Sequence, residues 1–89
     1  MINHNDIPEP EILETTIRES LKAKYGKVYV NLILDGWGID SCDANNLCMH
    51  SASAFTSRII RSRLLFDMRQ TVSYIYGICP DVIIEVNET

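Results

Sequence analysis

Three cysteines and a histidine are the residues of this chain that could bind a metal ion. Cys42, Cys48 and His50 lie close together in the sequence, and Cys79 follows much later. Zinc sites usually contain pairs of ligands separated by two to four residues, and these positions do not have that spacing. Unpaired cysteines also pack as small apolar side chains. We therefore expect metal-free cysteines and no cofactor. Because their number is odd, we also expect a reducing compartment such as the cytoplasm.

A second candidate for chemistry is the segment LILDGWG, residues 32–38, in which Asp35 follows an apolar run. This segment resembles the N-terminal strand of cofactor-independent phosphoglycerate mutases, in which the matching aspartate ligates a metal ion. Members of that family also need further aspartate and histidine ligands and a serine nucleophile, whereas this chain has two histidines in total. The chain also contains no glycine-rich phosphate loop. We therefore expect that the protein is not an enzyme.

The most distinctive cluster of side chains is basic. Residues 51–70 contain four arginines and one aspartate, in a chain whose formal net charge is −4. Helical periodicity places most of these arginines opposite an apolar face, while Arg63 falls on the apolar side and must reach solvent or a partner. The predicted binding residues for nucleic acid or a partner protein are Ser53, Ser57, Arg58, Arg61, Ser62 and Arg69.

Length and composition limit the architecture that can position these residues. A chain of 89 residues with 46% hydrophobic content can form one domain with a modest core, and dimerisation would add to that core. No apolar run reaches the roughly 18 residues of a membrane span, and the N-terminus lacks the features of a signal peptide. We therefore predict a disordered arm over residues 1–8 and a single cytoplasmic domain over residues 9–89.

The first half of the domain shows two clear periodicities. From Pro10 to the residue before Gly26, apolar side chains recur at helical spacing, with glutamates early and lysines late, as the helix dipole favours. The apolar stripe of this predicted helix consists of Ile12, Leu13, Thr16, Ile17, Ser20 and Leu21. Residues 27–35 alternate and predict a half-buried strand. A glycine-rich break follows, with Trp37 predicted to fold over the edge of the core.

The second half predicts helices and a terminal strand. Asp43 or Ser41 can cap a short helix over residues 44–49, and Ser51 or Ser53 can cap a second helix that extends to Phe66. The apolar face predicted for the second helix consists of Phe55, Ile59, Ile60, Leu64 and Phe66. Residues 71–78 fit a strand by alternation, or a continuation of the helix by the spacing of Met68 and Val72. Residues 81–87 predict the last strand.

If residues 71–78 form a strand, the elements follow the order α-β-α-α-β-β, with a helix-turn-helix and a terminal hairpin. This α+β order resembles the winged helix-turn-helix DNA-binding superfamily. The resemblance implies that the second helix of the pair enters the major groove and that the hairpin touches the DNA backbone. The alternative is α-β-α-β with a long second helix, and such a chain would dimerise because a two-stranded sheet is marginal.

Two functions therefore remain open. In the first, the protein is a small DNA-binding regulator that uses helix 51–66 as its recognition helix, and a homodimer sets the half-site spacing. In the second, it is a protein-interaction module or inhibitor that docks an acidic partner through the face formed by Arg58, Arg61 and Arg69. Few basic residues are available for phosphate contacts, so one subunit should bind DNA weakly.

Overall fold

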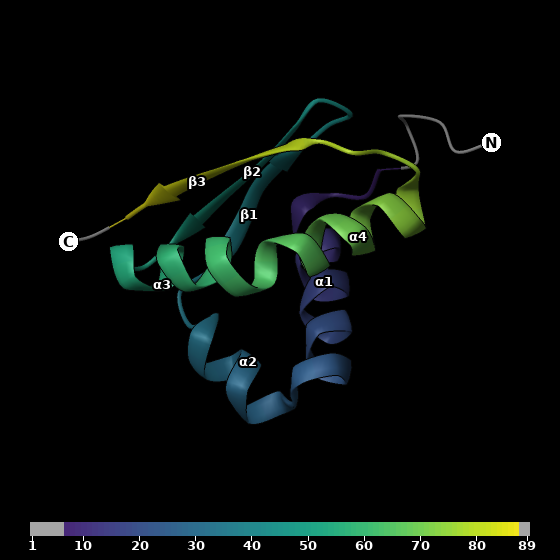
Figure 1. Ribbon diagram of the computed structural model, residues 1–89. Coiled ribbons are helices and arrows are strands. Elements are labelled where there is room, and N and C mark those ends of the chain that lie inside the picture. Colours follow the sequence, from purple (N-terminus) through teal and green to yellow (C-terminus); the bar gives the residue numbers. More distant parts are fainter. Residues whose placement is uncertain (1–6, 88–89) are drawn as a thin grey trace.

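The computed structural model describes residues 7–87, so the first six residues of the predicted arm and the last two residues of the chain lie outside the described part. A three-stranded sheet forms one layer, and the helices lie on one side of it (Figure 1). The chain therefore has the predicted α+β class. In order, the elements are α1 (Pro10–Tyr25), α2 (Lys27–Ile33), β1 (Gly38–Cys42), β2 (Asn46–Ser51), α3 (Ala54–Ile59), the π-helical turn η2 (Ile60–Leu64), α4 (Leu65–Tyr76) and β3 (Asp81–Val86).

The sheet combines antiparallel and parallel pairing in the strand order β1-β2-β3. β1 and β2 form an antiparallel hairpin, in which Ile39 lies opposite Met49. β3 runs parallel to β2 and places Ile84 opposite the same Met49. A parallel pair needs a long connection between its strands, and the helical segment α3-η2-α4 supplies it. β3 is therefore an edge strand, and α3 contacts it.

The hydrophobic core lies between the sheet and the helices. Alternate side chains of β2 are buried, as the two-residue period of a strand requires, and Leu47 and Met49 are fully buried. Asn46, Cys48 and His50 point to the opposite face of the sheet, and the helices of residues 7–87 all lie away from that face (Figure 1). The buried core consists of Leu13, Ile17, Leu21, Val30, Leu34, Trp37, Ile39, Leu47, Met49, Ile60, Leu64, Met68 and Val72.

Helix α1 agrees with its prediction at both ends. It begins at Pro10, and Gly26 ends it with φ 92°, a backbone conformation that favours glycine. The part of the predicted stripe that faces the core is Leu13, Ile17 and Leu21. Ile12 was predicted on the same stripe but is 57% exposed, because it lies one residue, about 100° around the helix, from the buried row of Leu13.

The predicted strand over residues 27–35 is wrong, because Lys27–Ile33 form helix α2. Six of the nine positions in this run are apolar or aromatic, so the run fits the helical period as well as the strand period. Val30 in the helix and Leu34 at its C-cap are four residues apart and both are buried, whereas Leu32 is 73% exposed. Packing against α1 decides between the two periods, since β-propensity depends on tertiary context.

The predicted helix over residues 44–49 is also wrong, because β1 and β2 form a hairpin here. The predicted helix cap, Asp43, closes the hairpin turn instead. Its Oδ1 accepts hydrogen bonds from the backbone N–H groups of Asn45 and Asn46 at 2.8 and 2.7 Å. Aspartate makes the same local contact in turns and at helix starts, so its presence alone could not distinguish the two.

The helix reading of residues 71–78 is right up to Tyr76, and the strand reading is wrong. Met68 and Val72 are both fully buried on one face of α4. Gly77, with φ 71°, ends the helix in the left-handed conformation. The sheet nevertheless has three strands, because the hairpin β1-β2 replaces the single early strand of the prediction.

The consecutive elements α3, η2 and α4 form one helical segment, Ala54–Tyr76, which we call the long helix. Three of its side chains lie elsewhere than predicted. Phe55 and Phe66, predicted on the apolar face, are 63% and 69% exposed, and Arg63, predicted on the apolar side, is exposed as well. For Arg63 and Phe66 the cause is η2, in which the N–H of Leu65 donates to the carbonyl oxygen of Ile60, five residues earlier. Phe55 lies before this turn, in α3. This wider turn rotates the following side chains relative to a regular α-helix.

Candidate functional site

Two of the predicted serines make side-chain hydrogen bonds within the helical segment, and the third is buried. Ser53 is the N-cap of α3, and its Oγ accepts a hydrogen bond from the N–H of Thr56 at 3.1 Å. Ser57 is buried. The Oγ of Ser62 donates to the carbonyl oxygen of Arg58 at 2.9 Å. These contacts account for the serines as parts of the helix and leave the arginines as the exposed candidates.

Two of the predicted arginines line one groove. Arg61 and Arg69 lie eight residues apart on the long helix with Leu65 midway between them, and all three border a cavity of about 420 Å³. Eight helical residues correspond to a rise of about 12 Å. The arginine groove, as we call it below, is lined by Arg61, Leu65, Phe66, Arg69, Gln70, Ser73 and Cys79.

The far wall of the arginine groove comes from the segment that enters β3. Cys79 belongs to this segment, and its Sγ lies 3.5 Å from the Oγ of Ser73 on α4. Between the two arginines the lining is apolar, because Leu65 is half-buried and Phe66 is largely exposed at the wall. The groove therefore has a positive group at either end and an apolar surface between them.

Sequence reasoning missed the apolar and polar lining of the groove. Phe66 was assigned to the core, Cys79 was considered only as a metal ligand, and Leu65, Gln70 and Ser73 were not singled out. One signal was present in the sequence, because Arg61, Leu65, Arg69 and Ser73 recur every four residues. Residues at that spacing share a helix face. No such signal marks Cys79, which reaches the groove only through the tertiary fold.

The other arginines of the long helix lie outside the arginine groove. Arg58 is exposed but does not line it. Arg63 borders a separate hollow of about 490 Å³, together with Tyr25 and Tyr29. The structure therefore brings Arg61 and Arg69 together and separates both from Arg58.

The arginines of the long helix form no ion pair within residues 7–87. The ion pairs of these residues are Lys22–Glu19 and Lys24–Asp67, and the His50 ring contacts the Asp40 carboxylate. Arg18 behaves differently, because it donates to the carbonyl oxygen of Leu34 at 3.3 Å and lies 5.4 Å from the ring centroid of Trp37, which is buried as predicted. Arg61 and Arg69 thus carry positive charge that no described carboxylate neutralises.

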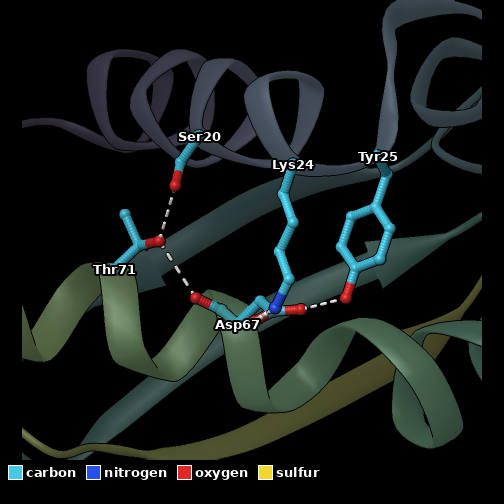
Figure 2. Close-up of polar contacts among 5 residues, drawn as sticks. All are labelled: Ser20, Lys24, Tyr25, Asp67 and Thr71. Atoms are coloured by element: carbon cyan, nitrogen blue, oxygen red, sulfur yellow. Dashed lines mark hydrogen bonds and ion pairs between the residues drawn. The ribbon is translucent and has the colours of Figure 1, made fainter.

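The one acidic residue of the long helix is held on a different flank (Figure 2). The Asp67 carboxylate accepts a hydrogen bond from the Lys24 ammonium at 2.7 Å and another from the Tyr25 hydroxyl. On the same flank, the Thr71 hydroxyl donates to the Asp67 carbonyl oxygen and contacts the Ser20 hydroxyl at 3.0 Å. We call these five residues the α1–α4 latch. It keeps the carboxylate of Asp67 away from the arginine groove.

The α1–α4 latch also shifts the acidity of its members. The hydrogen bonds from Lys24 and Tyr25 hold the pKa of the Asp67 carboxyl below its usual range, because both stabilise the charged form. In return, the hydrogen bond to Asp67 raises the pKa values of Lys24 and Tyr25. The carboxylate is therefore ionised and bound within the molecule at neutral pH.

A larger hollow of about 630 Å³ lies beside the latch, between α1 and α4. Its two charged lining residues, Lys24 and Asp67, pair with each other. The remaining lining is neutral, with exposed Tyr74 at its rim. Because its charges are already satisfied internally, this hollow offers a ligand less electrostatic attraction than the arginine groove does.

The residues considered for metal chemistry lie apart from the arginine groove, except Cys79. Residues 7–87 contain no group of three or more His, Cys, Asp or Glu side chains that could hold a metal ion. His50 instead pairs with Asp40, whose Oδ1 lies 2.9 Å from the His50 Nδ1. Burial raises the pKa of the Cys42 thiol, and neighbouring Asp43 adds to the shift, so this thiol is not activated.

Comparison with known proteins supplies no relative for the chain. It matches no protein-family model and no curated protein. Within residues 7–87, the helices are too short or too polar to cross a lipid bilayer.

Proposed function

We propose that the chain is a protein-interaction module whose arginine groove binds an acidic, extended segment of a partner protein. The observation that carries this proposal is the placement of Arg61 and Arg69 on either side of Leu65 in one groove, with no ion partner in the described residues. Arginine and aromatic side chains are enriched at protein interfaces, and Phe66 adds exposed apolar area.

The spacing of the groove defines the partner segment. In an extended chain, residues i, i+2 and i+4 point to one face, and residues i and i+4 are about 13 Å apart. That length matches the rise of about 12 Å between Arg61 and Arg69. A segment with an acidic residue, an apolar residue and a second acidic residue at alternate positions therefore places two carboxylates at the arginines and an apolar side chain at Leu65.

The groove favours a protein segment over duplex DNA, the other function predicted from the sequence. The apolar surface at Leu65 and Phe66 has no counterpart in a row of phosphates. Strong duplex binding also needs many phosphate contacts, about 6–10 in well-studied cases, whereas this groove presents two arginines. We therefore treat DNA binding as the competing outcome of the test.

The test is a titration of the full chain into a labelled Glu-Ser-Leu-Ser-Glu peptide at low salt, followed by fluorescence anisotropy. A scrambled peptide of the same composition is the first control. Arg61→Ala and Arg69→Ala should each weaken binding roughly fivefold, the upper range for one exposed ion pair. Arg63→Ala is the matched control, because it removes another exposed arginine, which lies outside the groove.

The same titration with random duplex DNA separates the two functions. Specific peptide binding that depends on Arg61 and Arg69 supports the proposal. Equal binding of the scrambled peptide contradicts it. Tighter binding of the duplex, weakening log-linearly with salt, would favour the DNA-binding prediction instead.

A further inference from the structure

The chain itself contains a segment with the pattern that the arginine groove requires. On β3, Asp81, Ile83 and Glu85 occupy alternate positions, and all three are exposed. They form an acidic strip, a carboxylate at each end with an apolar side chain between them. Ile83 is 44% exposed, so the apolar member is available for contact as well.

The acidic strip lies on the face of the sheet away from the helices. Its three residues pair in register with Asn46, Cys48 and His50 of β2, which point to the same face. That face carries no helix of residues 7–87 (Figure 1). Val82 and Ile84, the intervening residues of β3, pack against the core instead. The strip is therefore held rigidly in an extended conformation and presented outward.

Strip and groove match in length, charge and order. Asp81 and Glu85 are four strand residues apart, about 13 Å, and Arg61 and Arg69 are separated by a helical rise of about 12 Å. Each pair has one apolar position at its centre, Ile83 on the strand and Leu65 on the helix. Whichever way along the groove the strand runs, each carboxylate of the strip therefore meets one arginine, and Ile83 meets Leu65.

Within one molecule these surfaces do not meet. No ion pair in residues 7–87 joins Asp81 or Glu85 to an arginine. The strip faces away from the helices, whereas the groove lies between the long helix and the segment that enters β3. Their complementarity can be used only between two molecules.

We propose that the partner is a second copy of this chain, which places its acidic strip in the arginine groove of the first. The proposal rests on the proposed function, since it uses the same groove, and it adds the identity of the bound segment. The contact is heterologous, because the two copies contribute different surfaces. In such a pair, one copy therefore keeps its arginine groove free and the other keeps its acidic strip free, unless the copies form a closed assembly.

Two charge-reversed variants test the contact directly. In the groove variant, Arg61→Glu and Arg69→Glu are combined; in the strip variant, Asp81→Lys and Glu85→Lys are combined. We expect the wild-type protein to show a weight-average mass in sedimentation that rises with concentration and falls with added salt. Each variant alone should stay at the monomer mass over the same concentration range.

Mixing the variants supplies the decisive measurement. The groove variant keeps an intact strip, and the strip variant keeps an intact groove, so an equimolar mixture should associate although neither variant does so alone. The two reversed surfaces are also opposite in charge to each other, so the mixed complex can grow as the wild-type complex does. A mixture that stays monomeric, although the wild type associates, would overturn the assignment of these two surfaces.

A matched control excludes a general effect of charge. Combining Arg58→Glu with Arg63→Glu reverses the same number of arginines on the same helix, but outside the groove. This variant should associate as the wild type does, and loss of its association would overturn the proposal. Thermal unfolding of every variant should show that each one is folded.

The failure of this inference can be distinguished from the failure of the proposed function. A wild-type chain that remains monomeric at all concentrations, while still binding the Glu-Ser-Leu-Ser-Glu peptide through Arg61 and Arg69, overturns the second copy alone. A chain that neither associates nor binds the peptide overturns both. Self-association that the groove and strip variants abolish, and that their mixture restores, supports both.

Discussion

The two flanks of the long helix differ in whether their charged side chains are paired within the molecule. On the flank toward α1, the carboxylate of Asp67 is bound by Lys24 and Tyr25, so its charge is satisfied inside the molecule (Figure 2). On the flank of the arginine groove, Arg61 and Arg69 have no described ion partner. The first flank stabilises the fold, whereas the second remains available for binding.

This difference shows how a chain with a net charge of −4 can present a basic surface. The helix carries one acidic residue in its basic segment, and the α1–α4 latch holds that residue away from the groove. The polarity of the groove therefore depends on tertiary contacts as well as on composition. Substitutions in the latch should therefore change the free energy of unfolding without changing peptide binding. Substitutions of the groove arginines should change peptide binding with little effect on the free energy of unfolding.

The largest loss of stability is expected from a substitution on the buried face of the long helix. Leu64 is fully buried, so Leu64→Ala should lower the free energy of unfolding by about 2–5 kcal/mol through lost burial and a new cavity. Leu65→Ala, on the half-buried neighbour in the groove, should cost less stability but weaken peptide binding. Urea unfolding of both variants checks this ranking, and an equal loss in the two would contradict it.

The next largest effect is expected in the latch. Asp67→Asn replaces the charged acceptor of two hydrogen bonds, so it should lower the free energy of unfolding by about 1–2 kcal/mol. Peptide binding to the arginine groove should be unchanged. Asp35→Asn is the control, because this aspartate is exposed in the turn after α2. A loss of peptide affinity in Asp67→Asn would show that the flanks are not independent.

The latch should also make stability depend on pH in acid. The pKa of Asp67 is lower in the folded chain than the value of about 3.9 for an unfolded aspartate, so the unfolded state binds this proton more readily. The contribution of Asp67 is therefore present above about pH 4 and is lost as pH falls through its folded pKa. Stability curves of the wild type and Asp67→Asn should converge in that range, and parallel curves would argue against the latch.

The smallest effect on stability is expected in the groove itself. Arg61→Ala and Arg69→Ala remove exposed side chains without described ion partners, so each should change the free energy of unfolding by no more than about 0.5 kcal/mol. The same substitutions should give the fivefold losses of peptide affinity stated above. Equal losses of stability and affinity would mean that the arginines support the fold instead.

Parts of the fold were predictable because local signals and tertiary packing agree there. Helix α1 has a clear apolar stripe, favourable charges at its ends and a glycine at its end, and β3 has an alternating pattern bounded by a turn. The secondary structure predicted for residues 27–35 and 44–49 was wrong for a shared reason. Their patterns fit two structures equally well, and only contacts with distant segments distinguish the two.

The candidate site was predictable to a similar extent. Helical spacing identified Arg61 and Arg69 as exposed, but it also assigned Phe66 to the core and Arg63 to the apolar side. The π-helical turn η2 is responsible, because a sequence analysed at a constant 3.6 residues per turn cannot include it. Cys79 joins the groove only because β3 returns beside β2.

The sequence by itself determined the α+β class, the first helix, the last strand and the concentration of arginines in residues 51–70. These features depend on local periodicity, end signals and composition, which neighbouring residues carry. The tertiary structure alone decided that residues 27–33 are helical and that Asp67 is bound by α1. It also decided that two arginines share a groove while the acidic strip faces the other side of the sheet. These outcomes depend on contacts between residues far apart in the sequence, and no local pattern specifies which of those contacts forms.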